Sequence, residues 1–276
     1  MKQPLFKRIF QKMKELVVFA AGQRVSVNAA HVSFFLVLAA FPLLVLLLSI
    51  LRYTGLDVNG LTDILHGVVP KALFPTIEKV ILSAYRSTSG AVVSLSVITA
   101  LWSSSRGFYS LTTGLNDIYG VSESRDFWRV RLLSVVYTFL FLLVLLLTLV
   151  LNVFVPAFLN NIPVKGPVWQ LVWEVVNMRY LLLFLIQTGL FTAMFMALPN
   201  KHNKFLDSLP GALLASVGWQ AFSNLYSIYV ENFASYKNIY GSVYALALSM
   251  LWLYFCISIL FYGAVLNHWL MDNRKK

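Results

Sequence analysis

Six long apolar stretches constrain this chain more than any other feature of its sequence. Each holds roughly 20 residues with few charges, and a helix of that length crosses the roughly 30 Å hydrocarbon core of a bilayer. Backbone polar groups must be paired inside hydrocarbon, so we expect these stretches to be helices. The predicted spans are residues 32–51, 90–111, 132–155, 180–198, 209–230 and 244–270.

The composition also indicates a membrane protein. Of the 276 residues, 59% are hydrophobic and 12% are charged, whereas globular domains average about 45–50% and about 25%. The single cysteine, Cys256, excludes a disulfide framework or a cysteine-rich metal site within one chain. The net charge of +11 indicates membrane orientation rather than nucleic-acid binding, because of where the charges lie.

The distribution of basic residues predicts the topology. Lysines and arginines concentrate in the N-terminal segment, in residues 125–131 and 201–204, and at the C-terminus. The basic residues between the other spans are largely matched by acids. Because loops rich in Lys and Arg stay in the cytoplasm, the sequence predicts an all-α polytopic membrane protein with six transmembrane helices and both termini cytoplasmic.

The chain divides into an N-terminal segment, residues 1–30, and a six-helix bundle, residues 31–276. Residues 52–89 are predicted to form an external amphipathic loop. The N-terminal segment is a predicted amphipathic interfacial helix on the anionic cytoplasmic leaflet, since its other positions are mostly basic. A solvated arm packed on the bundle is the alternative. The apolar face consists of Phe6, Ile9, Phe10, Met13, Leu16, Val17 and Ala20.

The second span carries a line of polar residues at alternating steps of three and four. This spacing places them on one face of a helix. Polar groups that face hydrocarbon go unpaired at a cost of several kcal/mol each, so we expect this face to meet other helices or a wet cavity. The polar line consists of Ser96, Thr99, Ser103, Arg106, Ser110, Thr113 and Asp117.

Two groups of polar residues are candidates for a substrate path or a polar bundle interior. In the first group, Arg106 leads because a charged side chain in a span indicates a functional site; the alternative is an anchor that reaches lipid phosphates. In the second group, the alternative is ordinary hydrogen bonding between helices. The groups are Ser103, Arg106, Ser110, Asn116 and Asp117 in and after the second span, and Gln220, Ser223 and Asn224 in the fifth.

A series of short motifs carries a resemblance to a known family. They are Ala30–Phe35 with Ala40–Leu44, Leu101–Phe108 with Leu115–Asn116, Pro199–Asn200, Pro210–Ala212, Tyr240–Ser242, Leu251–Tyr254 and Gly263–Ala264. In this order and spacing, over nearly the whole chain, they resemble the YihY/BrkB family of bacterial inner-membrane proteins, once labelled ribonuclease BN.

The resemblance implies a multi-pass protein of the bacterial cytoplasmic membrane with a lipid-flippase-type role. The chain departs from the family in the last span, where many relatives have an acidic residue in a Gly-Ala-Glu-type motif. Here Val265 follows Gly263 and Ala264. If that carboxylate couples relatives to protons or cations, this protein lacks the coupling or takes it from elsewhere.

The residues do not support the family's older nuclease label. Metal-dependent RNA cleavage needs clustered carboxylates and histidines, but His31, His66, His202 and His268 are scattered. The basic residues follow the membrane and form no aromatic-interleaved RNA patch. We therefore expect no enzyme activity, metal site, cofactor or nucleic-acid partner, and no ATP-driven step, since no nucleotide-binding loop occurs.

The sequence favours a transporter or a lipid- or amphiphile-flippase-like protein of the cell envelope, with membrane lipids as its partners. The alternative is a non-transporting scaffold for envelope proteins. A continuous polar cavity open to one leaflet would favour transport, and a dry interior with a grooved exterior would favour the scaffold. The substrate, the energy coupling and the oligomeric state are left open.

Overall fold

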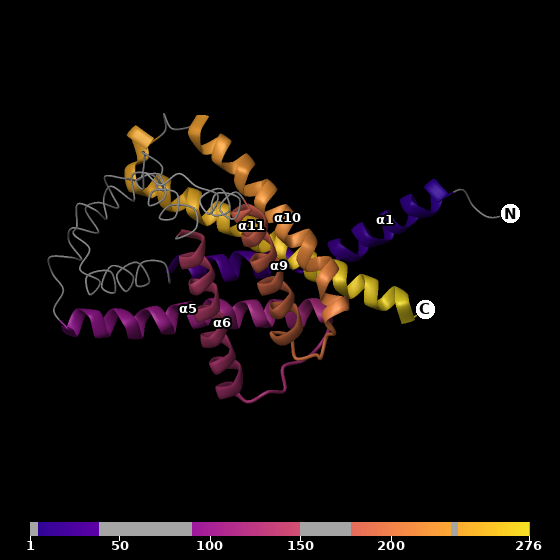
Figure 1. Cartoon of the computed structure of the whole chain (residues 1–276), viewed down its shortest axis with the longest axis horizontal. Coiled ribbons are helices and arrows are strands. Elements are labelled where there is room, and N and C mark those ends of the chain that lie inside the picture. Colours follow the sequence, from indigo (N-terminus) through magenta and orange to yellow (C-terminus); the bar gives the residue numbers. More distant parts are fainter. Residues whose placement is uncertain (1–4, 39–89, 150–177, 233–236, 276) are drawn as a thin grey trace, which may run out of the picture.

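The computed structural model describes residues 5–38, 90–149, 178–232 and 237–275, and within these ranges every regular element is a helix. The predicted all-α class is therefore confirmed for this part of the chain. The helices are α1 (Leu5–Ala21), the helix Val25–Leu38, α5 (Gly90–Tyr119), α6 (Phe127–Leu149), α9 (Arg179–Ala197), α10 (Phe205–Asn232) and α11 (Lys237–Lys275) (Figure 1).

The helices agree with the predicted spans in position and differ from them in length. Helix α9 matches its predicted span within one residue at each end. Helix α5 continues past residue 111 to Tyr119, and α6 begins at Phe127 rather than at residue 132. Most of the first predicted span, the predicted external loop 52–89 and the end of the third span lie outside the described residues.

One described segment is long and apolar enough to cross a bilayer. It is Leu246–Arg274 within α11, which has a mean hydropathy of 1.9. Val25–Leu38 and Leu181–Ala197 are apolar but shorter. Six spans with both termini in the cytoplasm therefore stay a prediction.

The N-terminal segment forms two helices. Helix α1 ends at Ala21, where the Gly22 N–H donates to the Val18 and Phe19 carbonyls. The next helix begins at Val25 and crosses the predicted boundary at residue 31. The described start of the first predicted span, residues 32–38, therefore belongs to a helix that begins before the apolar run.

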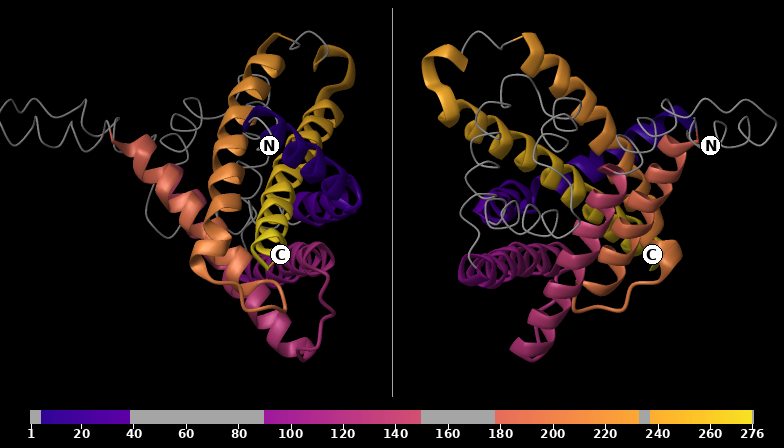
Figure 2. Two further views of the ribbon diagram at one scale, coloured as in Figure 1. Left: turned by 90° about the vertical axis from the view of Figure 1, so that its right-hand side faces the viewer. Right: turned by 60° about the vertical axis from the view of Figure 1, so that its left-hand side comes forward.

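The helices pack around α11. Helix α10 packs against α9 and α11, α5 packs against α6 and α11, and α1 contacts α11. Two turned views show α10 and α11 as a pair with α5 on the other side of α11 (Figure 2). Helix α1 and the C-terminal end of α11 lie at the same end of the molecule (Figure 1).

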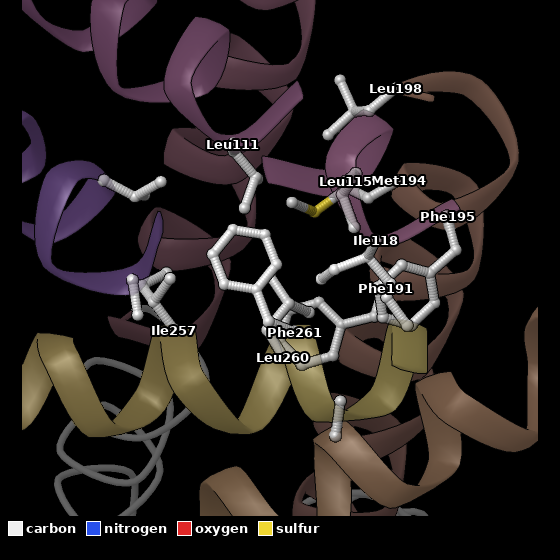
Figure 3. Packing of buried hydrophobic residues seen from close by; sticks show 14 of the residues in the cluster. Leu111, Leu115, Ile118, Phe191, Met194, Phe195, Leu198, Ile257, Leu260 and Phe261 are labelled. Atoms are coloured by element: carbon white, nitrogen blue, oxygen red, sulfur yellow. The ribbon is translucent and has the colours of Figure 1, made fainter. Parts of the chain in front are cut away.

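The core lies where α5, α9 and α11 meet, and it is built mainly from large apolar side chains, with buried polar groups such as Thr112 and Thr192 beside them. Figure 3 shows Phe261 of α11 directed toward Leu111 and Leu115 of α5, with Phe195 of α9 close by. Phe195, Phe261 and Leu115 are fully buried. A Cβ atom at Gly114 would lie 2.6 Å from the Phe261 ring, so glycine leaves the room that this ring occupies.

Helices α10 and α11 approach most closely where two glycines face each other. A Cβ atom at Gly263 would lie 2.5 Å from the Gly211 carbonyl oxygen, and one at Gly211 would collide with the Gly263 carbonyl oxygen. Both obstacles are backbone atoms that cannot rotate away. Small residues allow this kind of helix contact in membranes, where packing rather than the hydrophobic effect holds helices together.

A buried asparagine completes the same crossing. Pro210 lies inside α10 and has no N–H to donate. Beside it, the Gly211 N–H donates to the Asn267 Oδ1 at 2.6 Å, and the Asn267 Nδ2 donates to the Ser208 carbonyl at 2.9 Å. Asn267 is fully buried. Its amide, which comes from α11, therefore provides hydrogen-bond partners for the α10 backbone around the proline.

Gly263→Ala is expected to destabilise the protein, because the new methyl group meets the backbone of α10. Overpacking of this kind costs about 1–3 kcal/mol. Gly189→Ala is the matched control, since a Cβ there has no neighbour within 4 Å. Thermal unfolding in detergent should show a lower midpoint for Gly263→Ala than for Gly189→Ala, and equal midpoints would contradict this crossing.

Candidate functional site

The polar line of α5 is mostly exposed. Thr99, Arg106, Thr113 and Asp117 are exposed, and Ser110 is buried. These four residues are not enclosed by the described helices, and the prediction that this face meets other helices or a wet cavity stays a prediction. A competing face of α5 packs inward instead, where its large apolar side chains fill the space between the helices by close packing. It contains Phe108, Leu111, Thr112, Leu115, Asn116, Ile118 and Tyr119.

The hydroxyl groups of α5 find hydrogen-bond acceptors within their own helix. Ser110 donates to the Arg106 carbonyl at 3.0 Å, Thr113 to the Tyr109 carbonyl at 3.1 Å and Thr99 to the Leu95 carbonyl at 2.7 Å. Bonds of this type satisfy a hydroxyl without a neighbouring helix. The hydroxyls can therefore lie at the surface, whereas the charges of Arg106 and Asp117 still require a partner.

Arg106 and Arg131 meet at one tryptophan where α6 crosses α5. The guanidinium carbon of Arg131 lies 4.4 Å from the centroid of the Trp102 ring, and that of Arg106 lies 5.8 Å from it. Both distances fall within the range of about 6 Å for cation–π contacts. The Arg131 Nη2 also donates to the Trp102 carbonyl at 3.3 Å. The ring itself is 57% exposed.

Asn116 and Asp117 take part in contacts between segments. The buried Asn116 donates to the Glu123 Oε2 at 2.8 Å and accepts from the Asn200 N–H at 2.7 Å. Asp117 accepts from the Asn28 Nδ2 at 3.3 Å. Asn116 thus joins the loop after α5 to the loop after α9, which is a structural role.

Arg125 strengthens the same junction. Its Nε and Nη2 donate to the two Glu123 oxygens at 2.8 Å and 2.7 Å. It also donates to the carbonyls of Ala197 and Leu198, at 3.3 Å and 2.7 Å, where the negative end of the α9 dipole lies. The Arg125 guanidinium lowers the pKa of Glu123 to about 2, which keeps this carboxylate charged.

The second group of candidates makes contacts between helices. The Gln220 Nε2 lies 3.4 Å from the Gln187 Oε1 of α9, and Ser223 accepts from the Trp252 Nε1 of α11 at 3.2 Å. Asn224 is exposed. These contacts match the structural alternative for this group. The Ser103 side chain of the first group is not among the described ones.

An apolar groove of about 390 Å³ runs between α1, α10 and α11. Val265, at the position that is acidic in many relatives, is buried against this groove and brings no charge to it. Exposed Lys12 and Lys14 lie on α1 at either side of its apolar face. The groove is lined by Leu16, Val17, Ala20, Ala21, Leu214, Tyr262, Val265 and Leu266.

Sequence reasoning missed three residues that matter here. The basic residues 125–131 serve there only to indicate the topology. Arg131, however, lies next to the third apolar run, where a charge needs an explanation. Asn267 is a polar residue one turn after Gly263, and that position was a usable signal. Asn200 gave no such signal, because its donors reach Ser122 and Ser124 only through the folding of two distant loops.

A comparison with models of known protein families shows which family the chain belongs to. The model of the family described as Virulence factor BrkB matches residues 19–276. The chain belongs to the BrkB family. The resemblance drawn from the motifs is therefore confirmed.

Individual relatives extend over most of this BrkB-family chain. The "Putative ribonuclease-like protein YfkH" of Bacillus subtilis is 29% identical over 252 residues, which is 90% of each chain. The "UPF0761 membrane protein RC1_0578" of Rhodospirillum centenum is 26% identical over 89% of this chain, which spans 54% of the relative. A "UPF0761 membrane protein" of Chromohalobacter salexigens is 25% identical over 97% of this chain and 65% of its own length.

These matches and the apolar helices identify the chain as a membrane protein of the BrkB and UPF0761 group. No solved structure matches it significantly.

The stability contributed by Glu123 should depend on pH. Its pKa falls from an ordinary 4.5 to about 2 in the folded protein. The contribution is therefore complete above pH 4.5 and is lost as the pH falls toward 2. Between pH 5 and about 3, the thermal midpoint of the wild type should fall more steeply than that of Glu123→Gln, and parallel slopes would contradict the Glu123–Arg125 contact.

Proposed function

We propose that this protein moves amphiphilic lipids between the leaflets of the bacterial cytoplasmic membrane, along the exposed polar face of α5. The proposal includes a multi-pass topology with both termini in the cytoplasm, which the common position of α1 and the end of α11 supports (Figure 1). It includes no enzymatic step and no cofactor.

The observation that carries the proposal is the exposure of the polar line. In a membrane protein, a surface that includes Arg106 and Asp117 is costly against acyl chains, because charged groups lose their hydration there. A lipid headgroup on this face would supply polar partners while its tails stay in the hydrocarbon. The exposed polar positions follow one another along the helix as Thr99, Arg106, Thr113 and Asp117.

Such a path needs no water-filled interior, and this agrees with the packing of the core. The cavity between the described helices has a volume of about 30 Å³, and its lining is apolar, including Leu111, Phe191 and Trp219. That volume holds about one or two water molecules. This small cavity is not the continuous polar cavity that would favour transport through the interior, so the proposed path lies on the outer face of α5.

The groove beside α1 supports the handling of lipids as well. The residues that line it are apolar apart from Tyr262, and its volume of about 390 Å³ offers room for part of an acyl chain. The lysines that flank the apolar face of α1 favour anionic headgroups at the membrane surface. A lipid could therefore be held beside the helix pair without entering the core.

The second candidate function is a scaffold. It is favoured by the closely packed interior of the described helices, which leaves no room for a substrate. In that case a partner protein would cover the polar face of α5 and pair with its charges. The two candidates differ in one measurable respect, which is whether the purified protein moves lipid by itself.

The test is lipid scrambling in liposomes that contain the purified chain. Phospholipids with fluorescent headgroups that reach the outer leaflet are bleached by an added reductant. The wild type should move the inner-leaflet lipids outward, so that they are bleached quickly. Arg106→Ala should slow the bleaching of this inner pool at least about tenfold, which corresponds to about 1.4 kcal/mol. Arg129→Ala is the control, since Arg129 is exposed and pairs with Asp126 at 3.9 Å.

If wild-type liposomes bleach no faster than protein-free ones for any lipid tested, lipid movement is wrong and the scaffold is favoured. If Arg129→Ala slows the movement as much as Arg106→Ala, general surface charge is responsible and the path along α5 is wrong.

A further inference from the structure

We propose that Arg106, Arg131 and Trp102 form a binding site for the phosphate of an anionic phospholipid headgroup at the crossing of α5 and α6. This inference rests on the proposed function and gives it a substrate class. The site is the pair of guanidinium groups at one tryptophan ring, with carbon-to-centroid distances of 4.4 Å and 5.8 Å.

The two arginines bring like charges to one place. Guanidinium groups on opposite helices repel each other, and the repulsion grows as water is displaced by lipid. The chain holds them there because the Trp102 ring attracts both and its carbonyl accepts from Arg131. An anion that contacts both groups would turn this repulsion into attraction.

No carboxylate compensates these charges within the described ranges. The ion pairs there are Arg125 with Glu123, Arg129 with Asp126, His268 with Asp272, and Arg274 with Asp207. The nearby arginines of the α5–α6 connection, Arg125 and Arg129, therefore each have an acid. Among the described side chains, Arg106 and Arg131 therefore have no acidic partner that compensates their charges.

Phosphate suits the geometry of the two side chains. Each guanidinium is a planar fork with five N–H donors and binds phosphate oxygens through paired hydrogen bonds. Arg131 uses one nitrogen for the Trp102 carbonyl and keeps the rest for a ligand. Arg106 and Trp102 are exposed, so a ligand can reach the pair from outside the helix bundle.

The surroundings favour a lipid headgroup over free phosphate. Arg131 lies early in α6, after Phe127 and Trp128, which are 59% and 78% exposed. Large aromatic side chains of this kind gather at the depth of lipid headgroups. The site thus combines two positive charges with an exposed aromatic surface, at the depth where a phospholipid places its phosphate.

The test is lipid binding to the full chain in neutral detergent micelles, measured by native mass spectrometry. The probes are phosphatidylglycerol, phosphatidylcholine and inorganic phosphate. The wild type should bind phosphatidylglycerol about tenfold more tightly than phosphatidylcholine, because both lipids carry the same phosphodiester but the two guanidinium groups repel the trimethylammonium group of phosphatidylcholine. Arg106→Gln and Arg131→Gln should each lower the preference, and the double variant should abolish it.

Arg129→Gln is the matched control, because it removes the same charge from the same helix two residues away. It should keep the preference for phosphatidylglycerol. Arg131→Lys keeps the charge and loses the planar fork, so it should bind more weakly than the wild type while retaining the fold. Circular dichroism of each variant separates a lost site from a lost structure, and the single variants serve if the double variant does not fold.

Three outcomes would overturn the inference. The first is an unchanged preference for phosphatidylglycerol in the folded double variant or in both folded single variants. The second is an equal loss of that preference in Arg129→Gln. The third is displacement of the lipid by inorganic phosphate at comparable concentration, which would indicate a soluble anion as ligand. Scrambling reports separately on the proposed function. Selective binding without lipid movement would support the site and contradict the proposed function. Lipid movement that the double variant does not affect would support the function and contradict a role for the site in it.

Discussion

The structure depends on the close contact of α10 and α11 at Gly211 and Gly263. Backbone meets backbone there, and the buried amide of Asn267 bonds to the α10 backbone on both sides of Pro210. Within lipid, helices gain no hydrophobic energy by associating, so close packing and satisfied polar groups must hold them together. This contact fixes α11, and α11 in turn carries Phe261 into the core against α5.

The proposed function follows from the two faces of α5. One face is apolar and packs inward, whereas the other carries Thr99, Arg106, Thr113 and Asp117 at the surface. The small cavity among the described core residues is apolar, and the exposed polar side chains of this helix are available from outside. The crossing with α6 adds Arg131 and Trp102 at one point of that outer face. Under the proposed function, lipids would be handled at this outer face.

The sequence predicted the all-α class, the family and the position of α9 well, because long apolar runs and ordered motifs are local signals. It predicted that the line containing Arg106 shares one helix face, but not that four of its residues are exposed. Spacing shows which residues share a face but not which of two partly polar faces packs inward, and that depends on the room left by Gly107 and Gly114. The pairing of Arg131 with Trp102 was out of reach, because only the crossing of α5 and α6 brings them together.

The central claim is that lipid headgroups occupy the outer face of α5. The most direct measurement is photocrosslinking with a phospholipid whose headgroup carries a photoreactive group, followed by mass spectrometry of the labelled peptides. The account predicts labels at the exposed positions Thr99, Arg106 and Thr113, with none at the buried Ser110. Labelling that avoids α5 and falls on other helices would contradict it.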